Sequence, residues 1–231
     1  MNRKIPFVNE EFHHCFNRGV DKRPIFLDIM DYERYLDSMY LLNTFNDGLM
    51  TKWRDYKKYH PKVKPWDFKV IKPEERLVDI LCYCLNENHY HKILIQLQYK
   101  GIETFMHKIG TSYSMYFNKK YKRSGSLCQG VFKSVYIETN DQLLYLSAYV
   151  NANHFIHRCE KTKKKSKGFT LGDDNWKYSS LLEYMGKRKA SLCNLDPILE
   201  QFKNCEEYKN YANVNALYMR EKKEMEKYWL E

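Results

Sequence analysis

Two histidines in one short stretch give the sequence its clearest capacity for chemistry. The stretch NHYHKILIQL, residues 88 to 97, alternates in the manner of a β-strand. Successive side chains of a strand point to opposite faces, so His89 and His91 share one side with Ile93 and Ile95. Two imidazoles at this spacing are close enough to bind one metal ion. They could equally cap the edge of a core, with their nitrogens bonded to the backbone.

A tyrosine and an asparagine further along the chain could complete such a site. In DQLLYLSAYVNANHF, residues 141 to 155, Tyr145, Tyr149 and Asn153 lie four apart and share one stripe of a helix. If this helix crosses the sheet face that carries the histidines, Tyr149 stands beside the metal and Asn153 can supply an oxygen ligand. The alternative is that Tyr145 and Tyr149 are ordinary core aromatics.

Periodicity and turn signals predict the elements that must position these residues. Asp28 can cap a first helix, and Thr139 with Gln142 has the spacing of a capping box for the helix that carries Tyr149. Residues 86–88 are a short turn, so the histidines open the second arm of a hairpin. We expect strands within residues 7–19, 77–86, 89–97 and 130–138, and helices over residues 28–39, 102–117 and 141–155.

The order of these elements predicts the fold class. Two strand–helix–strand units around a central hairpin indicate an α+β fold, a ferredoxin-like antiparallel sheet with helices on one face. Residues 46–75 have no clear periodicity and are expected to form an irregular surface insertion. We predict a domain over residues 1–160 and an extension over residues 161–231. The extension begins with a basic loop at 161–167 and continues as a helical tail.

Composition points to a polyanionic partner. The chain of 231 residues has a formal net charge of +10 and contains 20 tyrosines, a combination suited to a polyanion whose bases can stack. A soluble basic protein without such a partner is the alternative. The N-terminal residues carry charges where a signal peptide needs an apolar run, and no later run is long enough to span a membrane, so we expect a cytoplasmic protein. The seven cysteines form no C-x-x-C pair of the zinc-finger type.

Basic side chains flank the predicted site and could hold phosphates. For each of them the alternative is an ordinary solvated surface charge. The candidates are Arg18, Lys22, Arg23, Lys119, Lys120, Lys122, Arg123 and Lys133.

Several of these stretches together resemble a known family. The sequence resembles the single-tyrosine transposases of the His-hydrophobic-His (HUH) endonuclease superfamily, especially the REP-associated tyrosine transposases. The resemblance covers most of the chain. It is carried by FHHCFNRGVDKRPIFLD near the N-terminus, NHYH at 88–91, GTSYSMYFNKKYKRSGSLCQGVFKSVYIE at 110–138, LSAYVNANHFIH at 146–157 and NWKYSSLLEYMGKR at 175–188.

The resemblance implies roles for individual residues. His89 and His91 match the metal-binding pair of the family, Tyr149 its nucleophile and Asn153 its third, helix-borne ligand. Where the family has Asn-Pro, this chain has Asn153 followed by His154, which makes His154 an alternative ligand. The implied cofactor is Mg²⁺ or Mn²⁺, and mixed nitrogen and oxygen ligation suits Mn²⁺ somewhat better.

The resemblance also implies a reaction and a substrate. Tyr149 would attack a DNA phosphorus atom, giving a 5′-phosphotyrosine link and a free 3′-hydroxyl that can rejoin DNA by the reverse reaction. The implied substrate is single-stranded or hairpin DNA, recognised by a monomer. The competing predictions are a noncatalytic nucleic-acid binder on the same sheet topology and a relative that binds hairpins without cutting them.

Overall fold

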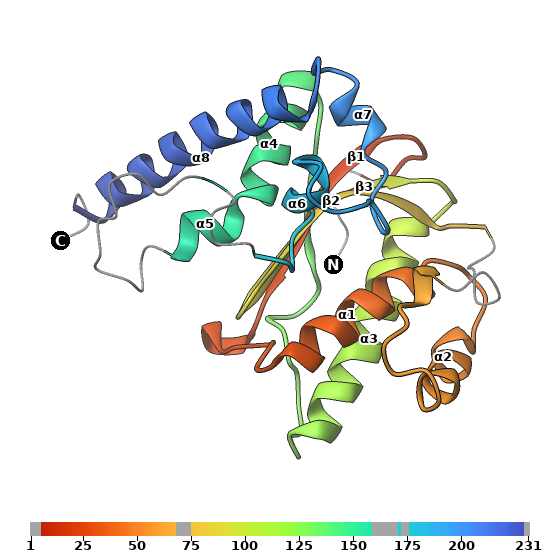
Figure 1. Ribbon diagram of the computed structural model, residues 1–231. Helices are drawn as coiled ribbons and strands as arrows, with labels where there is room; N and C mark the ends of the chain where they lie inside the picture. The colour runs from red at the N-terminus through yellow and green to blue at the C-terminus, as the bar shows by residue number, and fades with distance from the viewer. Residues whose placement is uncertain (1–5, 68–74, 159–170, 172–175, 229–231) are drawn as a thin grey trace.

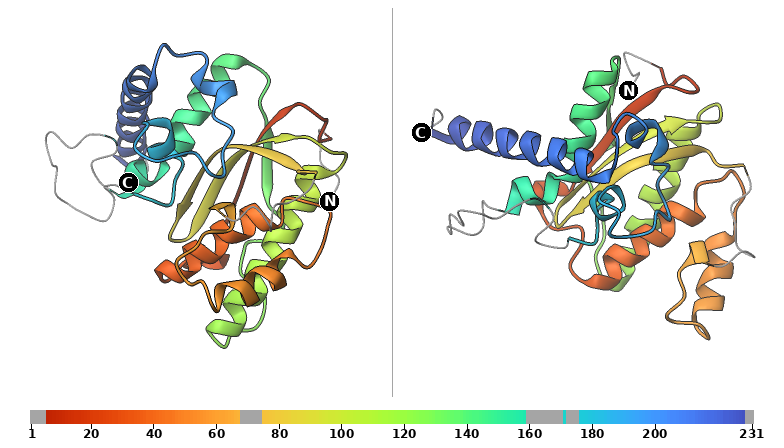
Figure 2. Two further views of the ribbon diagram at one scale, coloured as in Figure 1. Left: turned by 45° about the vertical axis from the view of Figure 1, so that its right-hand side comes forward. Right: turned by 45° about the horizontal axis from the view of Figure 1, so that its top comes forward.

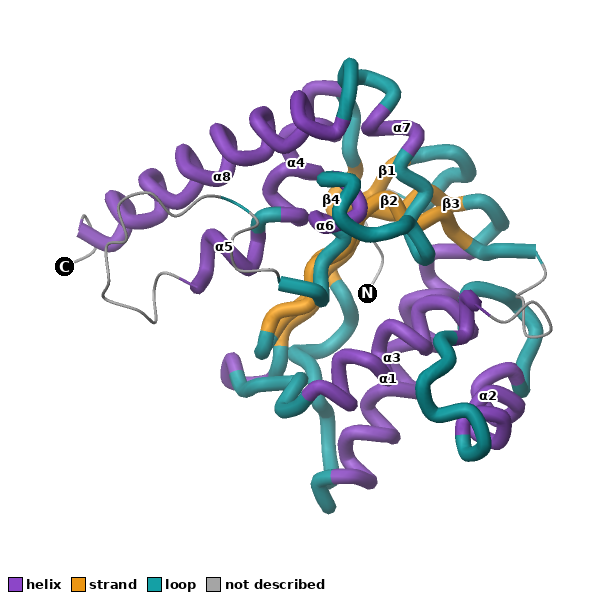
Figure 3. The backbone as a smooth tube through the Cα atoms, viewed as in Figure 1, coloured by secondary structure: helices purple, strands orange, loops and turns teal. Residues whose placement is uncertain are grey.

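A four-stranded antiparallel sheet forms the centre of the molecule (Figure 1). The computed structural model describes residues 6–67, 75–158, 171 and 176–228. In the strand order β2-β3-β1-β4 the central strands are β3 and β1, and the β2–β3 hairpin joins the two strand–helix–strand units along the chain, so the predicted ferredoxin-like α+β fold is confirmed (Figure 3). The strands are β1 (Phe12–Arg18), β2 (Val78–Asn86), β3 (His89–Gln96) and β4 (Lys133–Tyr136).

Two long helices cover one face of the sheet, as predicted. They are α1 (Ile29–Leu41) and α3 (Gly101–Lys120), and they lie side by side below the sheet in Figure 1. The Asp28 side chain accepts a hydrogen bond from the Asp31 backbone and caps α1. The apolar stripe expected on α1 is buried, including Tyr35 and Met39.

Later helices cover the second face, which was not predicted. Figure 2 shows α4 (Asn140–Asn151) and α8 (Cys205–Tyr228) on the side of the sheet opposite α1 and α3. With helices on both faces, β3 is buried along its length. Lys92 and Gln96, which alternation alone would leave facing water, are 0% and 1% exposed.

The helix expected over residues 141–155 is divided into two. Thr139 caps α4 by accepting from the Gln142 backbone, while the Gln142 side chain accepts from the backbone of Glu138. The first helix ends at Asn151, and α5 (Asn153–Arg158) begins two residues later. Asn153 is therefore at the start of a second helix, beyond the end of the one that carries Tyr149.

The described part of the extension packs on the sheet and on α4. Backbone hydrogen bonds join Tyr178 and Ser180 to the outer edge of β2, and the buried Tyr208 of α8 contacts α4. The extension contains α6 (Leu181–Tyr184), α7 (Asp196–Leu199) and α8. The predicted basic loop at 161–167 lies outside the described residues.

The predicted insertion forms a small separate cluster. Trp53 is 2% exposed within it, and its indole nitrogen donates to the Asp37 carboxylate of α1. The cluster contains α2 (Leu49–Lys57) and a short 3-10 turn at Pro65–Asp67, and a further 3-10 turn at Val20–Lys22 follows β1. None of the helices in the described residues is both long and apolar enough to cross a membrane.

Candidate active site

Strand β3 holds both predicted histidines on the face covered by α4. The strand starts directly after the turn formed by Glu87 and Asn88, so the imidazoles lie at the end of the sheet. The His89 and His91 rings are 5.2 Å apart between centroids, and the two residues are only 5% and 8% exposed. Burial and the neighbouring imidazoles of His14 and His89 hold the pKa of His91 well below its usual range. His91 is therefore neutral at physiological pH, the state that a metal ligand requires.

His89 and Asn153 bring a ring nitrogen and an amide oxygen together. His89 Nε2 lies 3.0 Å from Asn153 Oδ1, and His89 Nδ1 lies 2.7 Å from Asn88 Oδ1. Both ring nitrogens face an amide oxygen, which only accepts hydrogen bonds, and a neutral ring can donate to only one of them. The shorter contact is at Nδ1, and Nε2 also faces the Asn86 amide nitrogen, which only donates, so the proton is placed on Nδ1 and Nε2 keeps its lone pair. The two lone-pair atoms, His89 Nε2 and Asn153 Oδ1, both face the amide nitrogen of Asn86, at 3.2 and 2.8 Å.

This pair fits a divalent cation. Two ligands about 2.1 Å from one Mg²⁺ ion and at right angles to each other lie about 3.0 Å apart, which is the observed separation of His89 Nε2 and Asn153 Oδ1. Among the described residues, no three His, Cys, Asp or Glu side chains are grouped as ligands of one ion. A cation held by His89 would need donors of another kind as well, and the amide oxygen of Asn153 is the one that lies beside Nε2.

Tyr149 lies against the imidazoles from the last turns of α4. Its ring meets the His91 ring edge to face at a centroid distance of 5.4 Å and the His14 ring at 6.2 Å. Burial raises the pKa of Tyr149, while the Asn153 amide and the Arg18 charge act in the opposite direction. The phenol therefore stays protonated at neutral pH and needs help to act as a nucleophile. Tyr145, one turn earlier, is 38% exposed.

His14 of β1 belongs to the site, although the sequence pattern did not predict it. Its Nε2 lies 2.9 Å from Nδ1 of His91, and the residue is 6% exposed. Burial lowers the pKa of His14 to about 4, so the ring is neutral at physiological pH. The adjacent pair His13 and His14 within a predicted strand was the signal available. It gave no indication of which of the two faces the β3 histidines.

His154 contacts Asn86, whose amide joins the His89–Asn153 pair. Its Nδ1 lies 3.3 Å from Asn86 Oδ1, and its ring is stacked on Trp176 at a centroid distance of 3.8 Å. The alternative ligand suggested by the sequence thus contacts the pair through Asn86.

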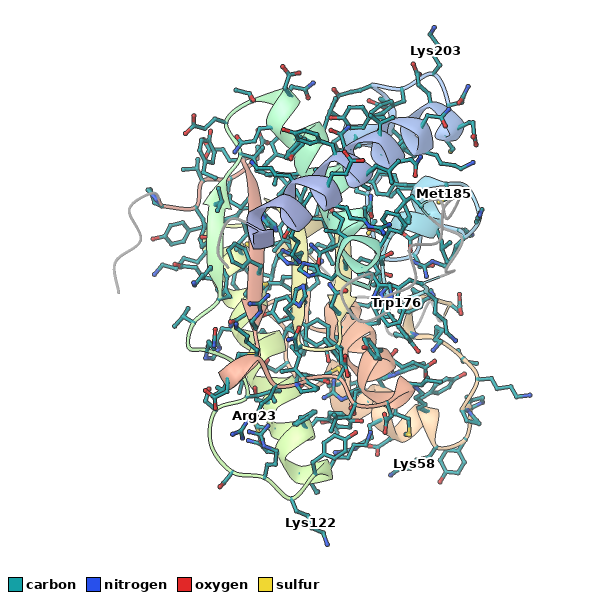
Figure 4. The ribbon with its side chains drawn as sticks, turned by 90° about the vertical axis from the view of Figure 1, so that its left-hand side faces the viewer. Arg23, Lys58, Lys122, Trp176, Met185 and Lys203 are labelled. Carbon is teal, nitrogen blue, oxygen red and sulfur yellow. The ribbon has the colours of Figure 1, made fainter. Side chains whose placement is uncertain are left out.

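The predicted phosphate-binding residues differ in their surroundings. Arg18 pairs with His89 in the β1–β3 register, and it is close enough to affect Tyr149. Lys120 is bound to the carboxylates of Asp28 and Asp31. Arg23 and Lys122 project from the same end of the molecule, opposite Lys203 (Figure 4). Exposed candidates are Lys22, Arg23, Lys119, Lys122 and Lys133, and partly buried ones are Arg18, Lys120 and Arg123.

Comparison with known proteins gives a likeness at the level of the fold. No family model matches the sequence, and no curated protein does. A solved structure of a REP-associated tyrosine transposase bound to a REP hairpin superposes with a TM-score of 0.50 and 11% sequence identity. The match covers 85% of this chain and 90% of that one. The protein therefore has the fold of a REP-associated tyrosine transposase.

Proposed function

We propose that the protein is a metal-dependent transesterase of single-stranded DNA, a transposase of the HUH type. It would cleave and rejoin hairpin substrates through a 5′-phosphotyrosine intermediate on Tyr149. The observation that carries the proposal is the meeting of three chain segments at one buried point. The Tyr149 ring of α4 packs on His91 of β3, and Asn153 of α5 lies 3.0 Å from His89.

The residues of the site have separate tasks in this reaction. Tyr149 Oη forms a bond to phosphorus, and the bond from phosphorus to the 3′-oxygen breaks. The phenol loses its proton, and the released 3′-oxygen gains one to become a hydroxyl. His89, His91 and Asn153 would hold Mg²⁺ or Mn²⁺. When bound, the cation supplies Lewis-acid stabilisation of charge on the phosphate oxygens. Arg18 adds a fixed positive charge beside the nucleophile.

The chemistry of the donor set favours a phosphate substrate. The two imidazoles and the Asn153 amide are neutral groups, so they leave the charge of a divalent cation undiminished. An anionic phosphodiester is then the natural group to balance it. The excess of basic residues, +10 overall, supports the same class of substrate.

A covalent adduct tests the proposal directly. The protein is incubated with Mn²⁺ and a DNA hairpin that has single-stranded flanks, labelled in separate samples at the 3′ or the 5′ end. We expect a labelled protein band on a denaturing gel with the 3′ label alone, because the 5′-phosphate of the downstream fragment stays on the tyrosine. With the 5′ label the expected product is a shorter free strand.

Two variants on one helix identify the nucleophile. Tyr149→Phe removes the hydroxyl and should abolish the adduct while hairpin binding in a gel-shift assay persists. Tyr145→Phe, one turn away, should form the adduct as the parent protein does. Hairpin binding without an adduct in the parent protein would overturn the proposal in favour of a noncatalytic binder.

A further inference from the structure

The side-chain amide of Asn86, the last residue of β2, connects three polar residues of the site, His89, Asn153 and His154. Asn86 is 4% exposed. Its Nδ2 lies 2.8 Å from Asn153 Oδ1, 3.2 Å from His89 Nε2 and 3.7 Å from the sulfur of Cys84. Its Oδ1 lies 3.3 Å from Nδ1 of His154. One buried amide therefore contacts the two lone-pair atoms, His89 Nε2 and Asn153 Oδ1, and also contacts His154, which stands where the family pattern has proline.

The Asn86 amide nitrogen and a cation would compete for the same two lone pairs. Nδ2 points its hydrogens toward His89 Nε2 and Asn153 Oδ1, the two atoms whose separation fits adjacent ligands of one ion. A cation bound by this pair must displace Nδ2, because a positive ion and an N–H donor repel each other. The oxygen of the same amide is, in contrast, a ligand of the kind that Mg²⁺ and Mn²⁺ accept.

We propose that Asn86 is a fourth cation ligand, which turns its amide by half a revolution and presents Oδ1 where Nδ2 now donates. The inference rests on the proposed cation site and adds a residue to it. In one orientation the amide joins His89 to Asn153 by hydrogen bonds, and in the other it joins them through the ion.

His154 is suited to hold the amide in both orientations. In one neutral tautomer, Nδ1 of an imidazole donates a hydrogen bond, and in the other it accepts one. Nδ1 of His154 can therefore donate to Asn86 Oδ1 and, after the amide turns, accept from Nδ2. The stacking of His154 on Trp176 keeps the ring in place while the proton moves between its nitrogens. The residue that departs from the family pattern thus supports the amide and stays out of the ligand set.

Substitution by aspartate gives the sharpest test, since its effects on cation affinity and on stability without metal have opposite signs. In Asn86→Asp, an oxygen faces the pair in either orientation. We expect Mn²⁺ to bind the full chain about tenfold more tightly, measured from the electron paramagnetic resonance signal of free Mn²⁺ during a titration. Without metal the melting temperature should fall, because the carboxylate faces two lone-pair atoms and donates to neither.

A matched variant separates the role of Asn86 from general charge attraction. Asn88 contacts the other ring nitrogen of His89, so Asn88→Asp adds the same charge beside the same imidazole without facing the lone-pair set. A carboxylate that accepts from Nδ1 also makes the imidazole a better ligand, so the two variants are distinguished in the protein without metal. There Asn86→Asp should lower the melting temperature and Asn88→Asp should not. An equal effect of the two variants on the melting temperature would show that Asn86 does not donate to the lone-pair atoms and would overturn its role.

An apolar replacement provides a second measurement of the same proposal. Asn86→Leu keeps the approximate volume and removes the ligand, so Mn²⁺ affinity should fall about tenfold. Unchanged affinity in Asn86→Leu and Asn86→Asp, with normal binding by the parent protein, would remove Asn86 from the ligand set. Absence of Mn²⁺ binding by the parent protein would instead overturn the cation site as a whole. The DNA adduct assay tests the reaction at Tyr149 independently of these Mn²⁺ titrations.

Discussion

The imidazoles of His14 and His91 are buried against each other, and their contact determines which nitrogen of His91 is left for other partners. His14 Nε2 lies 2.9 Å from His91 Nδ1, which directs Nε2 of His91 away from β1. Partners of this kind orient metal-binding histidines and commonly change affinity or activity by about 10- to 100-fold when removed. His14 is therefore a positioning residue for the proposed reaction.

His14→Phe should slow adduct formation by roughly tenfold or more. The substitution keeps an aromatic ring against Tyr149 and removes the hydrogen bond to His91. His14→Gln retains a side chain that can donate or accept, and it should restore part of the rate. The measurement is the single-turnover rate of the adduct, with melting temperatures to show that both variants are folded. Equal rates in the two variants would indicate that the hydrogen bond has no role.

Lys92 occupies the opposite face of β3 and is buried in the core. Its ammonium donates to the Tyr35 hydroxyl at 2.7 Å and lies 3.7 Å from the centre of the Tyr90 ring. Burial lowers the pKa of Lys92 from 10.5 to about 7. The folded protein thus binds fewer protons than the unfolded chain between these two values, and this residue makes stability rise with pH from about 7 toward 10.5.

Lys92→Met should remove this pH dependence. The free energy of unfolding is measured with urea at pH 7 and pH 9. Relative to the parent protein, the free energy of unfolding of the methionine variant should be higher at pH 7 than at pH 9. The difference between variant and parent should change by at most about 1.4 kcal/mol per pH unit. A difference that stays constant over this range would show that the lysine titrates at its ordinary pKa in the folded protein.

At the level of the elements, an ion pair joins the end of α3 to the start of α1. The ammonium of Lys120 contacts the carboxylates of Asp28 and Asp31, each at 2.7 Å, and Asp31 is fully buried. The neighbouring Lys119 is exposed. We therefore expect Lys119 to bind DNA and Lys120 to stabilise the fold, because two carboxylates already neutralise the charge of Lys120.

The paired variants Lys120→Ala and Lys119→Ala test this assignment. Lys120→Ala leaves the buried Asp31 without its cation and should lower the free energy of unfolding by about 1–3 kcal/mol. Lys119→Ala should change stability by less than about 0.5 kcal/mol and weaken hairpin binding in a gel-shift titration. Stronger loss of DNA binding in Lys120→Ala, at unchanged stability, would reverse the two roles.

The elements also show what sequence periodicity could and could not predict. Alternation placed His89 and His91 on one face, and helical spacing placed Tyr149 on one stripe with Tyr145 and Asn153, beside the histidines only if that helix crosses their face. The β2–β3 register, however, shifts between Ile80 and Cys82. This shift lies away from the histidines, where the two-residue turn at Glu87 and Asn88 pairs Asn86 with His89 and Cys84 with His91. Asn86 was not assigned to the site from the sequence because it was counted in the turn of residues 86–88, whereas it is the last residue of β2 and pairs with His89.

At the scale of the whole molecule, the C-terminal extension and the sheet share one core. Tyr208 of α8 is fully buried, and its hydroxyl accepts from Asn151 Nδ2 at 2.7 Å, while Ser180 donates to Asn151 Oδ1 at 2.6 Å. Asn151 ends the helix that carries Tyr149. The extension thus supports the helix end beside the site.

Tyr208→Phe should lower the free energy of unfolding by about 1–2 kcal/mol, because the Asn151 amide loses a buried partner. Tyr211→Phe, one turn later and partly exposed, is the control and should have little effect. Urea denaturation measures both. An equal loss in the two variants would mean that the Tyr208 hydroxyl does not tie the extension to α4.

The indole of Trp176 lies flat on His154, with 3° between the ring planes, and donates to the backbone of Leu85. Indole emission responds to its immediate neighbours, and three successive side-chain contacts, through His154 and Asn86, connect this ring to the His89–Asn153 pair. The molecule thus carries an intrinsic optical reporter beside the site where we propose ions and nucleic acid bind. Titrations could be followed by fluorescence without a label, with Trp176→Phe identifying the signal.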